Sequence, residues 1–106
     1  MKLNKLKEFE RGWIYGAFEP SLRFSRDTEV GILDFPAGYA PPDHMHKMAS
    51  EFNLILSGLV QVNGVVLGSD DIFSFDAGER IRIFFVKDTR LLCIKSPSLK
   101  GDKYEV

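Results

Sequence analysis

The sequence predicts an all-β domain, either a sandwich or a small barrel. From Trp13 onward, short apolar runs alternate with turn residues at close intervals, a pattern typical of consecutive short strands. The pair Asn63-Gly64 lies between two such runs, and both residues accept the positive φ angles of a two-residue hairpin turn. Seven or more short strands within roughly 90 residues favour a closed or two-layered β architecture.

The expected strands follow one another with turn residues between them. Pro41-Pro42 marks the start or the edge of a strand, because proline cannot donate a hydrogen bond to a sheet. Asp76-Ala77-Gly78 and Asp88-Thr89 have the composition of further turns. In chain order, we expect strands at residues 12–18, 29–35, 44–48, 51–57, 59–62, 65–67, 72–75, 80–86 and 90–96.

Length and composition exclude several classes of protein. The chain has 106 residues, 44% hydrophobic and 27% charged, which predicts one globular domain over residues 1–106. Residues 1–10 are expected to form a polar arm, and residues 97–106 a polar surface tail without an assigned role. A net charge of −1 provides no basic field for nucleic acid, and no apolar stretch has the length of a signal peptide or membrane span. The single cysteine, Cys93, excludes a disulfide framework, so we expect a soluble, cytoplasmic protein that binds neither nucleic acid nor membrane.

Both histidines lie in the tripeptide His44-Met45-His46, and Glu51 follows five residues later. Residues two apart in a strand point to the same face, so the two imidazoles should project together. Glu51 begins the next expected strand, and its carboxylate is expected to reach the same face. Two imidazoles and one carboxylate are the ligand set of non-haem iron(II) sites, and zinc uses it as well. The alternative interpretation is that these are ordinary polar strand residues without a metal ion.

The same residues resemble the first signature motif of the cupin superfamily. Every fixed position of that motif is filled at the family spacing, by Gly38, His44, His46, Glu51 and Gly58. The resemblance implies a single-domain, jelly-roll-like β-barrel. It also implies that His44, His46 and Glu51 bind a divalent metal ion, which in the family is usually iron, manganese, nickel or zinc.

The segment from Asp70 to Ile81 resembles the second cupin motif less closely. Asp70 stands in place of a glycine and Asp76 in place of a proline, although Gly78 is retained. Ile81 stands where the resemblance places the fourth ligand, a histidine. With three ligands instead of four, metal affinity should fall and one more position opens to solvent or substrate. A metal-free domain is the alternative.

Strand alternation predicts the lining of the barrel. Residues that share the face of Glu51, or one apolar face of the strand at 80–86, are expected to line a pocket that suits an organic ligand. Core packing is the alternative explanation for each of them. The expected pocket residues are Asn53, Ile81, Ile83 and Phe85.

The opposite face of the strand at 51–57 carries the apolar residues Phe52, Leu54 and Leu56. Such a stripe is expected to be covered. A second copy of the chain would cover it, as in many proteins that this chain resembles, and we therefore expect a homodimer. The alternative cover is the N-terminal arm.

The leading functional hypothesis is a metal-binding domain that acts on a small polar organic molecule, either a sugar or an organic acid. Glu51 is a metal ligand in this hypothesis and a candidate general base where no metal is bound. The family that this chain resembles includes isomerases, dioxygenases and decarboxylases. The sequence does not select among these reactions, and it leaves open whether the protein is an enzyme. The competing hypotheses are a non-catalytic, metal-free module that holds a ligand in the barrel, and a purely structural dimer.

Overall fold

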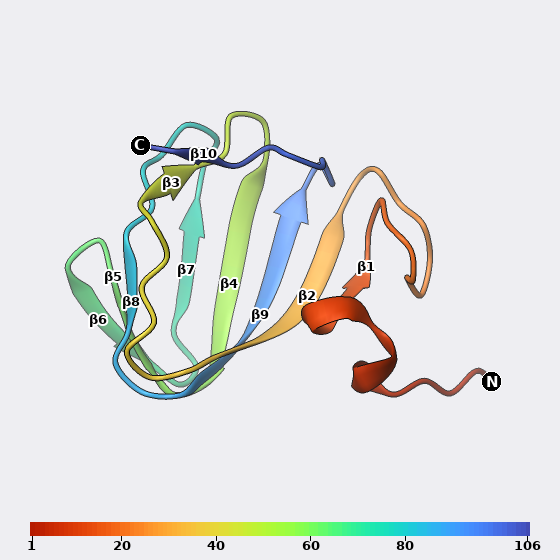
Figure 1. The fold of residues 1–106 in the computed structure, drawn as a ribbon, viewed down its shortest axis with the longest axis horizontal. Helices are drawn as coiled ribbons and strands as arrows, with labels where there is room; N and C mark the ends of the chain where they lie inside the picture. Colours follow the sequence, from red (N-terminus) through yellow and green to blue (C-terminus); the bar gives the residue numbers. More distant parts are fainter.

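A computed structural model describes residues 1–106 and confirms the all-β prediction (Figure 1). Two short 3-10 turns, η1 (Leu6–Glu8) and η2 (Glu10–Gly12), precede the strands. The strands are β1 (Trp13–Tyr15), β2 (Glu29–Phe35), β3 (His44–Met45), β4 (Ser50–Ser57), β5 (Leu59–Val62), β6 (Val65–Gly68), β7 (Ile72–Phe75), β8 (Ile83–Phe85), β9 (Thr89–Ser96) and β10 (Tyr104–Glu105).

The strands form three antiparallel sheets. The largest has the order β1-β2-β9-β4-β7, a second has the order β6-β5-β8, and β10 pairs with β3. Figure 1 shows β7, β4, β9 and β2 of the largest sheet side by side, with β5, β6 and β8 on the left. In the largest sheet β9 inserts between β2 and β4, so strands that are distant in the chain become neighbours there. The register of β2, β9 and β4 therefore decides which side chains meet inside the barrel.

The apolar core fills the end of the barrel between the two larger sheets. Alternate residues of each strand point inward, and the buried core residues are Ile55, Val60, Val62, Phe75, Ile81, Phe85, Leu91 and Cys93. The outer face of β4 and β7 instead leaves Phe52, Leu56 and Ile72 exposed. The N-terminal arm does not bury these three side chains, so the apolar stripe predicted on residues 51–57 lies open in the single chain.

Three expected strands are shorter than the sequence predicts. β1 ends at Tyr15, β8 begins at Ile83, and β3 ends at Met45. Beyond Met45 the backbone N–H groups of residues 47–49 donate to the Asp102 carboxylate instead of a neighbouring strand. The expected hairpin is confirmed: Asn63 and Gly64 have φ angles of 47° and 84° and connect β5 to β6.

The C-terminal tail lies mostly on the surface, as expected, but it also has a structural role that the sequence did not indicate. Tyr104 and Glu105 of β10 pair with Met45 and His44 of β3, and Asp102 is buried. The tail thus closes the end of the barrel where both histidines lie (Figure 1). No helix of the structure has the length and apolar character that crossing a membrane requires.

Candidate functional site

One end of the barrel, called here the polar end, is lined by a row of charged side chains that crosses the largest sheet. Lys95 of β9 lies directly opposite Glu29 of β2 on one side and Glu51 of β4 on the other. The next inward-facing row contains Gly31, Cys93 and Asn53. The following row is apolar, with Ile55 opposite Leu91. The inward-facing charged side chains of this sheet are therefore confined to one end of the barrel.

Both histidines are buried at that end, with 7% and 4% of His44 and His46 exposed. The Nδ1 atom of His44 lies 3.0 Å from the carbonyl oxygen of Pro42, and Nδ1 of His46 contacts the carbonyl oxygen of Asp102. A carbonyl oxygen only accepts hydrogen bonds, so each neutral ring carries its proton on Nδ1 and a lone pair on Nε2. The chain thereby fixes the tautomer of both rings, whose centroids are 5.5 Å apart.

The Nε2 atom of His46 faces the carboxylate of Glu51. The distance to Oε1 is 3.3 Å, yet Nε2 makes no hydrogen bond and is buried without a partner. A lone pair directed at a carboxylate oxygen is unfavourable, and a proton on Nε2 removes the conflict. The contact with Glu51 therefore raises the pKa of His46. Burial lowers the pKa of His44, which lacks such a partner.

Both oxygens of Glu51 are occupied by neighbouring groups. Oε1 lies 3.8 Å from Nζ of Lys95, and Oε2 accepts a hydrogen bond of 3.1 Å from Nδ2 of Asn53. Burial raises the pKa of Glu51, but His46, Lys95 and Asn53 together outweigh burial and lower it. Glu51 is thus a buried carboxylate that stays ionised beside an ammonium group.

Asp102 is a site residue that the sequence analysis missed. Its carboxylate accepts hydrogen bonds from the backbone N–H groups of Lys47, Met48 and Ala49, while its carbonyl oxygen holds His46. No signal in the local sequence could identify it, because the partners lie more than 50 residues earlier in the chain. Lys95 was also missed, although alternation from Cys93 and pairing with the strand of Glu51 could have placed it.

The residues fit a metal ion only in part. Nδ1–H groups that donate to backbone carbonyls, with Nε2 left free, are the usual arrangement of metal-binding histidines. However, the structure contains no group of three His, Cys, Asp or Glu side chains arranged to hold a metal ion. Ile81 forms a bridge with His44, through two backbone hydrogen bonds, and supplies no ligand. In addition, the Glu51 oxygen nearest His46 already faces Lys95.

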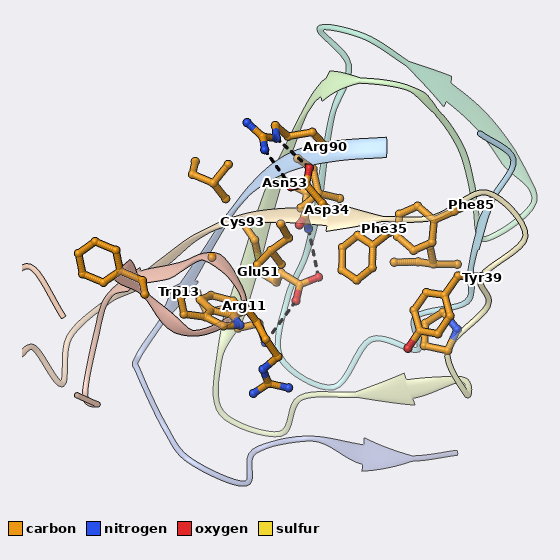
Figure 2. Close-up of a pocket in the computed structure, with 18 of the residues that line it drawn as sticks. Arg11, Trp13, Asp34, Phe35, Tyr39, Glu51, Asn53, Phe85, Arg90 and Cys93 are labelled. Atoms are coloured by element: carbon orange, nitrogen blue, oxygen red, sulfur yellow. Dashed lines mark hydrogen bonds and ion pairs between the residues drawn. The ribbon is translucent and has the colours of Figure 1, made fainter. Parts of the chain in front are cut away.

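A cavity of about 840 Å³ opens from this polar end. Of the four pocket residues expected from the sequence, Asn53, Ile83 and Phe85 line it, whereas Ile81 is 1% exposed and lies in the core. Figure 2 shows Trp13 on one side of the cavity and Glu51 between it and Phe35. The other end is aromatic: the rings of Phe35 and Phe85 are stacked 4.4 Å apart, and the nearly parallel ring of Tyr39 lies beside them, 5.9 Å from Phe35 and 6.1 Å from Phe85 (Figure 2).

Basic side chains outnumber acidic ones around the cavity. The lining includes two acidic residues, Asp34 and Glu51, and five basic residues, Lys7, Arg11, Arg90, Lys95 and Lys103. Asp34 and Arg90 neutralise each other through two hydrogen bonds on the rim (Figure 2). Lys7, Arg11 and Lys103 form no ion pair in the structure and remain available to a ligand.

Comparison with known proteins shows the fold. Neither a protein-family model nor a curated sequence matches the chain. A Klebsiella pneumoniae protein with a double-stranded β-helix domain matches with a TM-score of 0.68 at 18% identity, over 77% of this chain and 72% of that protein. The Streptomyces protein Pac13, a nucleoside dehydratase, matches with a TM-score of 0.66 at 17% identity, over 80% and 72%. A cupin-2 domain protein from Shewanella frigidimarina gives 0.58 at 12% identity, over 66% and 71%. The chain therefore has the cupin fold, as the resemblance of its first motif implied.

Proposed function

We propose that the protein binds a small organic anion in the barrel cavity. The observation that supports this most directly is the excess of basic side chains around the cavity, in a chain whose net charge is −1. Lys7, Arg11 and Lys103 are free to meet a carboxylate, because no acidic side chain pairs with them. Between the two ligand classes expected from the sequence, this charge favours an organic acid over a neutral sugar.

The aromatic end of the cavity defines the rest of the ligand. The stacked rings of Phe35, Tyr39 and Phe85 present flat apolar surface, so a ligand with a ring or another flat body fits that end. Its acidic group would then lie at the polar end, near the ammonium group of Lys103. Glu51 is ionised and lines the cavity, which makes it the candidate general base for a proton transfer.

A panel of ligands tests this function. Thermal stabilisation and calorimetry are measured with aromatic carboxylates, short aliphatic acids, neutral sugars and uridine, the last because Pac13 structures contain it. We expect aromatic carboxylates to stabilise the protein most. Lys103→Ala and Arg11→Ala should each weaken binding by about 3- to 10-fold, whereas Lys87→Ala, an exposed lysine away from the cavity, should not. Equal stabilisation by neutral sugars, or an equal effect of Lys87→Ala, contradicts the proposal. Turnover of the bound acid separates an enzyme from a binding module.

A divalent metal site at His44, His46 and Glu51 is the second candidate function. The buried Nε2 of His46, which has no hydrogen-bond partner, favours it. A bound metal ion would polarise a ligand carbonyl or lower the pKa of a bound water molecule. Metal analysis of the protein purified without added metal tests this candidate. Stoichiometric metal that disappears in the variant with both His44→Ala and His46→Ala supports it. Sub-stoichiometric metal in both proteins, together with no binding of added Zn²⁺ in calorimetry, rules it out.

A further inference from the structure

We infer that the ammonium group of Lys95 competes with divalent metal ions for Glu51 and keeps the metal affinity of this site low. The inference rests on the second candidate function, the metal site at His44, His46 and Glu51. It assigns to Lys95 a role that determines which cation the site holds.

The competition concerns one oxygen atom. Oε1 of Glu51 lies 3.3 Å from Nε2 of His46 and 3.8 Å from Nζ of Lys95. A metal ion shared by His46 and Glu51 would coordinate this same oxygen, because Oε2 accepts a hydrogen bond from Asn53. An ion at that place would lie close to a positive charge that is only 19% exposed, where repulsion is weakly screened by water.

The position of Lys95 is built into the sheet. It lies directly opposite Glu51 in the β4–β9 register, and on its other side it lies directly opposite Glu29. Its Nζ is also 5.2 Å from the centre of the Trp13 ring, and the absence of a side chain at Gly31 leaves room for that ring. The Glu51 carboxylate and one aromatic face thus hold the ammonium group in the barrel, and a metal ion must displace it.

A purely structural ion pair makes a different prediction. If Lys95 served only to stabilise the fold, its replacement would lower the free energy of unfolding and leave metal affinity unchanged or reduced. If it competes for Glu51, a neutral side chain of similar length frees Oε1, and the site should bind metal more tightly.

The test measures Zn²⁺ and Co²⁺ binding to the folded protein by calorimetry and by Co²⁺ absorbance. Four proteins are compared: wild type, Lys95→Met, Lys95→Arg and Lys103→Met. We expect Lys95→Met to bind metal about tenfold or more tightly than wild type. Lys95→Arg, which keeps the charge, should resemble wild type. Lys103→Met removes a cavity charge that acts on His44 but does not contact Glu51, so its gain in metal affinity should be much smaller than that of Lys95→Met. Adding His46→Ala to Lys95→Met should abolish the gain.

The outcomes separate the inference from the metal site itself. Equal, tight binding by wild type and Lys95→Met leaves the metal site standing and overturns the competition. An equal gain in Lys103→Met also overturns it, because the effect would then be one of overall charge. No binding to either protein overturns both the competition and the metal site, while the proposal of an organic anion is judged by its own ligand panel.

A measurement on the wild-type protein does not depend on how the variants fold. Lysine acetylation by acetic anhydride is followed by mass spectrometry with and without millimolar Zn²⁺. Displacement from Glu51 leaves more of Lys95 as the reactive free amine, so its labelling should increase about twofold or more relative to Lys103. Unchanged relative labelling under conditions in which Zn²⁺ binds would contradict the inference.

Discussion

The imidazole of His46 donates its Nδ1 proton to the backbone carbonyl oxygen of Asp102, a residue 56 positions later in the chain. The carboxylate of the same aspartate accepts the N–H groups of residues 47–49, which follow the histidine directly. One residue of the C-terminal segment therefore holds both the ring and the backbone that carries it. The geometry of the polar end depends on this segment as much as on the strands.

Asp102→Ala should destabilise the fold and loosen His46. The substitution removes the acceptor of the N–H groups of residues 47–49, and we expect a loss of about 1–3 kcal/mol in the free energy of unfolding. Urea denaturation measures the loss. Asp27→Ala is the matched control, because this exposed carboxylate accepts no hydrogen bond in the structure. Equal effects of the two substitutions would mean that the Asp102 contacts contribute nothing specific.

Acid should weaken the same contact. Burial raises the pKa of Asp102, but the N–H groups of Ala49, Met48 and Lys47 outweigh burial and hold it below the ordinary 3.8. A carboxyl group with a lowered pKa contributes stability that is present above its ordinary pKa and is lost as the pH falls through the folded value. We expect the difference in stability between wild type and Asp102→Ala to shrink below about pH 4. A difference that stays constant down to pH 2 would contradict this expectation.

The two histidines should titrate apart. The contact with Glu51 raises the pKa of His46 above 6.5, so its contribution to stability is complete below pH 6.5 and is lost as the pH rises through the folded value. Burial lowers the pKa of His44 below 6.5, so the contribution of this ring is lost instead as the pH falls. NMR titration of the ring protons measures both, with His44→Gln to assign the signals. The reverse order would show that Glu51 does not act on His46.

Ile81→His should strengthen the metal site, since residue 81 lies directly across from His44. We expect metal affinity to rise about tenfold or more in calorimetry. The same change places a polar ring in the core and should cost about 1–3 kcal/mol of stability. Ile72→His, at a side chain that is 70% exposed on the outer face, is the control and should leave metal affinity unchanged. No gain in Ile81→His would show that position 81 does not face the site.

Gly31→Ala should disturb the cavity wall. A methyl group at this position would lie 2.7 Å from the Trp13 ring, so the indole must move. We expect a loss of about 1–3 kcal/mol in the free energy of unfolding, together with weaker ligand binding. Gly68→Ala provides the control, since a methyl group there meets nothing closer than 3.8 Å. If both variants are equally stable, the close approach of Trp13 and Gly31 is unimportant.

The exposed apolar stripe on the outer face of the largest sheet supports the prediction of a homodimer. Phe52, Leu56 and Ile72 are 48%, 42% and 70% exposed, and a second copy of the chain is the cover that we expect. Phe52→Asp should raise the dissociation constant of the dimer about tenfold or more in sedimentation equilibrium. Val66→Asp, a change at a 59% exposed position of the other sheet, should not. A wild-type chain that is monomeric at all concentrations would contradict the prediction.

The sequence predicts the all-β fold correctly because turn residues and strand alternation are patterns of neighbouring residues. Asn63-Gly64 specifies its hairpin within two residues, and strand alternation correctly places Asn53 beside Glu51. The first-motif resemblance adds the fold itself, which the structural comparisons confirm. These signals depend on neighbours in the sequence or on spacing along one strand.

The remaining features depend on which distant strands become neighbours. Lys95 meets Glu51 only because β9 inserts between β2 and β4, and no local pattern reports that order. Asp102 reaches residues 47–49 only because the tail folds back across the barrel end. Polar composition gave no indication of this, since a buried aspartate and a solvated one look alike in the sequence.

The contact between Lys95 and Trp13 makes the polar end observable by light. Trp13 is the only tryptophan of the chain, and it lines the cavity with the Lys95 ammonium group 5.2 Å from its ring centre. The emission of an indole responds to a nearby charge, so displacement of that ammonium group should change the wavelength and intensity of the protein's intrinsic fluorescence. The chain therefore contains its own optical probe, positioned where an organic acid and a metal ion would each produce a signal without an added label.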